Sequence, residues 1–78
     1  MPTVLRSGPY RFFFYSSDGI EPPHLHVARD DSMAKFWLDP LLHHHSLGFR
    51  PTELRRIESI IAEQQPALLK AWHEYFAK

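Results

Sequence analysis

Two histidines separated by one residue, His24 and His26, offer the most compact chemistry in this sequence. Residues two apart in a β-strand point to the same face of a sheet, so the two imidazoles would lie side by side. Glu21 precedes them, and Pro22 and Pro23 form a loop or strand entry because proline cannot donate a ladder hydrogen bond. Imidazoles and a carboxylate at this spacing are suited to a divalent ion such as zinc. Glu21, His24 and His26 are therefore the predicted metal ligands.

The same histidines are also candidates for proton transfer. A carboxylate beside an imidazole orients the ring and raises its pKa, and Asp39 is the predicted partner of His24. His24, His26 and Asp39 would then be the catalytic residues of a metal-independent ribonuclease, since no serine or cysteine lies in a nucleophile motif. The predicted binding residues of such a site are Arg11 and Lys35, as phosphate contacts, and Trp37.

The alternative to both kinds of chemistry is an ordinary set of cross-strand polar pairs. Such pairs are common in antiparallel sheets. In that case His26 packs on Trp37, and His24 bonds Asp39 or a backbone carbonyl. The sequence alone leaves metal binding, catalysis and simple packing as three open alternatives.

Alternating apolar residues predict the strands that would carry these side chains. The predicted strands are residues 3–6, 10–16, 24–29 and 33–38, and the last two make a hairpin around residues 30–32. Pairing the apolar residues across this hairpin sets its register. The predicted pairs are Leu25 with Leu38, Val27 with Phe36, His26 with Trp37 and His24 with Asp39.

The strand predicted at residues 10–16 has apolar residues on both faces. Tyr10, Phe12 and Phe14 share one face, and Phe13 and Tyr15 share the other with Arg11. Antiparallel sheets usually expose one face to water. We therefore predict that a partner protein or a second copy of the chain covers one of these faces.

The second half of the chain has a helical pattern. Pro51 suits a first helical position, and a mid-helix proline such as Pro66 breaks the backbone ladder, so the pattern predicts two helices at residues 51–63 and 66–77. Residues 41–47 are left unassigned, with His43, His44 and His45 in a surface loop. The expected fold is a single α+β domain over residues 1–78, mainly β over 1–47 and helical over 48–78. Its small antiparallel sheet has three or four strands, with one face packed by two C-terminal α-helices.

The composition narrows the functional classes. A chain of 78 residues has a small core, and it has no cysteine, so a metal or an interface is the expected source of extra stability. Nine basic and nine acidic residues balance, which argues against general electrostatic affinity for nucleic acid. No long apolar stretch or signal peptide is present at the start of this sequence, so the prediction is a cytoplasmic protein that does not enter a membrane.

Several segments resemble a bacterial family of domains of unknown function, the family numbered 4160. The matching segments are residues 1–6, 8–16, 21–27, 34–38, 53–57 and 71–76. The resemblance implies a small stand-alone protein, often encoded beside a second small protein in a pair that looks like a toxin–antitoxin module. It brings no catalytic residues with it.

Two functional hypotheses follow from the sequence. The first is an interaction protein, the toxin-like member of a two-gene module, that forms a homodimer or binds its cognate small protein and acts on RNA. The second is a non-catalytic metal-binding or regulatory module that uses His24 and His26. Whether the protein is an enzyme stays open between them.

Overall fold

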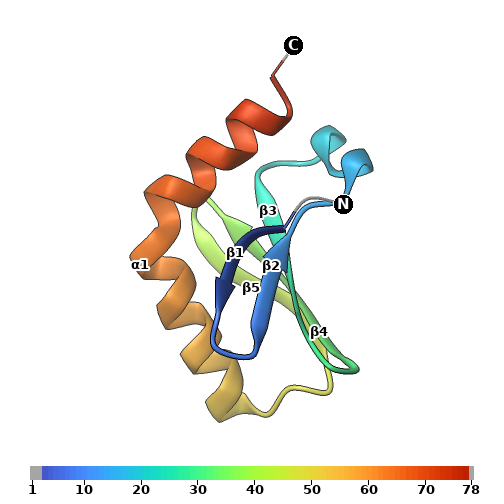
Figure 1. The fold of residues 1–78 in the computed structure, drawn as a ribbon, viewed down its shortest axis with the longest axis vertical. Helices are drawn as coiled ribbons and strands as arrows, with labels where there is room; N and C mark the ends of the chain where they lie inside the picture. Colours follow the sequence, from blue (N-terminus) through green and yellow to red (C-terminus); the bar gives the residue numbers. More distant parts are fainter. Residues whose placement is uncertain (1–2, 78) are drawn as a thin grey trace.

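The protein is an antiparallel β-meander braced by one long helix. The computed structural model describes residues 3–77. The five strands lie in chain order across the sheet: β1 (Thr3–Ser7), β2 (Tyr10–Phe13), β3 (His24–Arg29), β4 (Ser32–Leu38) and β5 (Leu41–Leu47). A short 3-10 helix, η1 (Ser16–Ile20), joins β2 to β3, and the α-helix α1 (Pro51–Tyr75) follows β5. Figure 1 shows α1 running along one side of the sheet, with η1 at the same end as the C-terminus. The α+β fold class is confirmed.

The prediction of two C-terminal helices was wrong, because α1 continues through Pro66. Proline has no N–H, so Pro66 leaves the carbonyl of Ala62 without its helical hydrogen bond. Both residues are exposed, so water can bind that carbonyl. Buried residues on both sides of the proline hold the two halves of the helix against the sheet: Ile57, Ile61, Leu68 and Trp72. Gln65 also donates a hydrogen bond to the carbonyl of Leu38 at the end of β4. Packing therefore offsets the local cost of the proline.

The prediction of three or four strands was also wrong, because residues 41–47 form β5 at one edge of the sheet. His43 lies opposite Phe36 and His45 lies opposite Lys35, so His44 is an extra residue in a β-bulge. The bulge interrupts the two-residue alternation by which strands are recognised. The three histidines are exposed, as predicted, but they lie on an edge strand rather than in a loop.

The predicted β3–β4 register was wrong by two residues. The hairpin turns through Asp30 and Asp31 alone, and Asp30 adopts a positive φ of 53°, a conformation that aspartate tolerates better than most residues. A shift of two keeps every side chain on its predicted face. The observed pairs are His24 with Trp37, Leu25 with Phe36, His26 with Lys35 and Val27 with Ala34.

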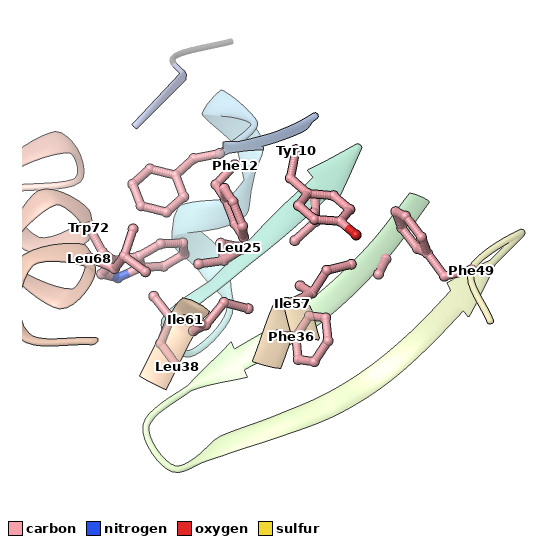
Figure 2. Packing of buried hydrophobic residues seen from close by; sticks show 13 residues of the cluster. Tyr10, Phe12, Leu25, Phe36, Leu38, Phe49, Ile57, Ile61, Leu68 and Trp72 are labelled. Atoms are coloured by element: carbon pink, nitrogen blue, oxygen red, sulfur yellow. The ribbon is translucent and has the colours of Figure 1, made fainter. Parts of the chain in front are cut away.

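The core lies between α1 and the sheet face that points toward it. Figure 2 shows the side chains of the strands and of the helix meeting in this layer. The strands contribute Tyr10, Phe12, Leu25, Val27, Ala34, Phe36 and Leu38, and the helix contributes Ile57, Ile61, Leu68 and Trp72. We call this the covered face and the opposite side the open face.

Polar contacts fix the first turn of α1 to the rim of the covered face. Arg29 donates from Nε and Nη2 to the two carboxylate oxygens of Glu53, at 2.6 and 2.9 Å. The Tyr10 hydroxyl donates to the same carboxylate at 3.1 Å. Two parallel bonds between a guanidinium and a carboxylate define direction as well as distance, so Glu53 sets where α1 begins over the sheet.

The chain itself buries Phe13, the last residue of β2, whose side chain lies on the open face. Its ring is 1% exposed, stacks on His26 at 5.6 Å and meets Tyr15 edge-on at 5.4 Å. Tyr15 remains 37% exposed. Because these contacts are internal, the doubly apolar strand no longer requires a partner, and the homodimer or cognate partner stays a prediction. No helix within residues 3–77 is long and apolar enough to cross a membrane.

Candidate functional site

Three side chains converge where η1 meets the start of β3. The Asp18 Oδ2 atom lies 3.3 Å from His24 Nε2 and 3.1 Å from His26 Nε2. One potential ligand atom from each of these residues lies within 4.8 Å of the other two. The two histidines therefore share one face of β3, as predicted, and a carboxylate from the preceding loop reaches both.

His24 is fully buried, with 0% of its surface exposed. Its Nδ1 atom lies 2.9 Å from the carbonyl oxygen of Pro22, so Nδ1 carries the proton and donates it to that oxygen. The rings of Trp37 and Trp72 lie 5.4 and 5.1 Å from the imidazole and hold its orientation. In the neutral ring, the Nε2 atom then presents a lone pair, and it has no hydrogen-bond partner within residues 3–77.

Asp18 owes its position to η1. The backbone amide of Tyr15 donates to Asp18 Oδ2 at 2.9 Å, and the Asp18 amide donates to the Tyr15 carbonyl at 3.0 Å. The next residue, Gly19, packs against Phe76, and a Cβ atom there would come within 2.7 Å of the Phe76 ring. A larger residue at position 19 would therefore require η1 or the Phe76 ring to shift.

His26 completes the cluster from the open face. It stacks on Phe13 and meets Tyr15 edge-on at 4.6 Å. Burial lowers the pKa of His26 below its ordinary value of 6.5, although the Asp18 carboxylate pulls the pKa in the opposite direction. The neutral imidazole is therefore the favoured form, and it is the form that binds metals.

The two distances from Asp18 to the histidines match the edge length of a tetrahedral site. An ion about 2.0 Å from each donor in a tetrahedral site holds its donors about 3.3 Å apart. The two distances from Asp18, at 3.3 and 3.1 Å, match this edge length. A lone pair of His24 Nε2 facing a carboxylate oxygen is also repulsive unless a positive charge lies between them. A cation between the two atoms would remove this repulsion.

Glu21, the predicted carboxylate ligand, lies on the other side of the His24 ring. Its Oε1 atom is 3.7 Å from Nδ1, the nitrogen already bonded to Pro22, and 2.7 Å from the ammonium of Lys35. That hydrogen bond from Lys35 lowers the pKa of Glu21. Asp18, and not Glu21, is the carboxylate that approaches Nε2 of His24. Sequence analysis missed Asp18 because residues 17–19 indicate only a turn.

Of the other residues predicted to form the site, Trp37 lies beside His24, whereas Asp39 does not reach it. Asp39 is exposed in the turn after β4, two residues beyond the residue that faces His24, so the predicted His24–Asp39 pair is not formed. Trp37 lies beside His24 instead of His26. Lys35 lies over the Trp37 ring at 4.7 Å, and Arg11 lies over Phe13 at 4.6 Å. Arg11, Lys35 and Trp37 thus share the open face with His26.

Comparison with known proteins gives one match. Neither the curated proteins nor the solved structures contain a match to this chain. The model of a family described as a domain of unknown function, DUF4160, matches residues 10–73, which include Asp18, His24 and His26. That match covers most of the 78 residues, and the chain therefore belongs to the DUF4160 family of domains of unknown function.

Proposed function

We propose that the protein is a divalent-metal-binding module, with Asp18, His24 and His26 as its ligands and zinc as the best-fitting ion. The observation that carries this proposal is the fully buried Nε2 atom of His24, which lacks a hydrogen-bond partner among the described residues and faces a carboxylate oxygen at 3.3 Å. An unsatisfied buried polar atom costs about 1–3 kcal/mol. Coordination of a metal would satisfy this atom.

A proton on His24 accounts less well for the same geometry. The Asp18 oxygen lies close enough to Nε2 for a charge contact, yet the pair does not meet the alignment of a hydrogen bond. A metal ion need not lie on the line that joins nitrogen to oxygen, because it contacts each donor separately. The Nδ1–carbonyl bond of His24 is also the outer contact that typically orients a metal-binding histidine.

Metal binding would supply the extra stability that this small chain was expected to need. The ion would join η1 to β3 across a loop, in a protein of 78 residues without cysteine. Binding energy at such a site is also folding energy.

The experiment is thermal unfolding of the protein after chelation with EDTA, with and without added zinc. Zinc at 100 times its dissociation constant stabilises the folded state by about 2.7 kcal/mol. For a domain of this size, that corresponds to a rise in Tm of about 10 °C or more. The Asp18→Asn and His24→Ala variants should lose the rise.

Glu21→Gln is the matched control, since Glu21 is the nearby carboxylate that lies away from His24 Nε2. It should retain the full response to zinc. A Tm that zinc leaves unchanged in the original protein, together with no metal by elemental analysis, would refute the proposal. An undiminished response in His24→Ala would do the same.

A second proposal, the toxin-like protein that acts on RNA, is supported by how charge is distributed. All nine acidic residues lie outside the five described strands, whereas four basic residues lie within them: Arg6, Arg11, Arg29 and Lys35. Arg11 and Lys35 lie on the open face, Arg11 over the ring of Phe13 and Lys35 over the ring of Trp37. Cationic and aromatic side chains on an exposed sheet are the groups that bind single-stranded RNA.

The second proposal is tested by expressing the protein in bacteria and measuring their growth, with and without the small protein encoded beside it. Expression alone should arrest growth, and co-expression should relieve the arrest and allow co-purification. Arg11→Glu should abolish both RNA binding and growth arrest, while Arg55→Glu, on the exposed side of α1, should change neither. Normal growth and no RNA binding would refute the proposal without affecting the metal site.

A further inference from the structure

The β-bulge in β5 puts two consecutive histidines on the open face. Neighbouring residues in a regular strand point to opposite faces, but a bulge places two residues opposite one. His43 packs against Phe36 at a ring distance of 5.2 Å, on the side of the sheet that α1 covers. His44 instead lies 5.3 Å from the ring of Trp37, and its own ring is 4.8 Å from that of His45. The structure thus divides the histidine run into a pair and a single residue.

The two paired imidazoles direct equivalent atoms at each other. The Nδ1 atoms of His44 and His45 are 2.6 Å apart, so only one of them can carry a proton between them. The other must offer a lone pair. Both side chains are exposed, so an ion can reach these nitrogens from solvent.

This spacing differs from that of the Asp18–His24–His26 cluster. Adjacent donors about 2.0 Å from an ion with square-planar or octahedral geometry lie about 2.8 Å apart, against about 3.3 Å for a tetrahedral ion. A separation of 2.6 Å is closer to the first value. Imidazole is a good ligand for Ni²⁺ and Cu²⁺, which favour this right-angled arrangement.

We propose that His44 and His45 form a second divalent-metal site, separate from the first, which takes Ni²⁺ or Cu²⁺ through its two Nδ1 atoms. Water molecules complete the coordination. The bulge is the feature that makes the site, because without it the two rings would lie on opposite sides of β5.

A specific site and adventitious binding to a histidine run predict different effects of replacing each of the three histidines. A flexible run would use any of its three histidines, and the loss of each would weaken binding to a similar extent. The bulge predicts that His44 and His45 both matter and that His43 does not. His43 is therefore a matched control one residue away.

The test is calorimetric titration with NiCl₂ in a His24→Ala background, which removes the first site. We expect one Ni²⁺ per chain, and a loss of affinity of about tenfold or more on adding either His44→Ala or His45→Ala, since even outer contacts of a metal site contribute that much. His43→Ala should bind as the background does. Circular dichroism shows whether each variant is folded: the three histidines of the run are exposed, but the His24 of the background is buried. Asp18→Asn, which leaves the buried ring in place, therefore serves as a second background.

Three results would overturn the proposal: no binding of Ni²⁺, equal losses for all three histidines, or no loss for His44→Ala and His45→Ala. The zinc response of the His44→Ala, His45→Ala double variant is read separately. If the zinc response persists, the first site is independent of His44 and His45. If the zinc response is lost, the separation of the two sites is refuted.

Discussion

The two faces of the sheet use the same strands for different tasks. On the covered face, alternate residues of β2, β3 and β4 are apolar and meet the buried stripe of α1. On the open face, polar and aromatic side chains such as His26, Lys35 and Trp37 lie among the apolar Phe13, Ala28 and Met33, and several stay partly exposed. Burial of apolar side chains on the covered face provides most of the stabilisation of the fold. The open face can therefore hold polar side chains without a large loss of stability.

His24 belongs to neither face alone. By alternation it shares the open face with His26, yet it is fully buried because Trp37 and Trp72 lie on two sides of it. A polar ring in that position is costly unless every nitrogen has a partner. His24, a buried polar side chain with an unsatisfied Nε2 atom, therefore lies at the boundary between the two faces.

The largest expected effect comes from truncating the covered face. Phe36→Ala should lower the free energy of unfolding by about 3–5 kcal/mol, because it removes a buried ring and leaves a cavity. Met33→Ala is the matched change on the open face of the same strand, where the side chain is 38% exposed. It should cost less than about 1 kcal/mol. Urea denaturation measures both, and equal losses would contradict the division of tasks between the faces.

The next effect concerns the helix that covers that face. Pro66→Ala restores an N–H that can donate to the Ala62 carbonyl, and both positions are exposed, so the change should raise the free energy of unfolding by about 1–3 kcal/mol. The zinc response on the other side of the sheet should stay the same. A loss of stability would instead show that Pro66 sets the path of α1 across the core.

Sequence reasoning located the α+β class, the hairpin and the faces of its strands, because these depend on local alternation. It missed β5, whose bulge at His44 disrupts that alternation, and it divided α1 at Pro66, where distant packing overrides a local preference. For the candidate site, it found His24 and His26 from their spacing. It missed Asp18, because residues 17–19 indicate only a turn, and the pattern of a turn does not show which strand its side chains will contact.

A smaller effect is expected for His24→Phe, which tests whether His24 contributes to stability or to metal binding. In the metal-free protein, His24→Phe should leave the free energy of unfolding unchanged or raise it by about 1 kcal/mol, since an unsatisfied buried nitrogen is removed. The same change should abolish the stabilisation by zinc. A loss of more than about 2 kcal/mol without metal would show that the contacts of His24 with Pro22 and Asp18 hold the fold by themselves.

The smallest effect compares two ion pairs, one on each face. Arg29 lowers the pKa of Glu53, and Lys35 lowers the pKa of Glu21, each by hydrogen bonding to the carboxylate. A carboxyl group whose pKa is lowered in the folded state contributes stability above its unfolded pKa, near 4.5, and loses it as pH falls through the lower folded value. Glu53→Gln should therefore reduce stability at neutral pH and converge with the original protein in acid.

Glu21→Gln should follow the same pH dependence with a smaller amplitude. Glu53 connects α1 to the sheet through Arg29 and Tyr10, whereas Glu21 connects a surface loop to Lys35. Both carboxylates reach solvent, so salt should reduce both effects. Denaturation at several pH values measures the two amplitudes. A larger amplitude for Glu21→Gln would mean that the open face contributes more to stability than its exposed polar surface implies.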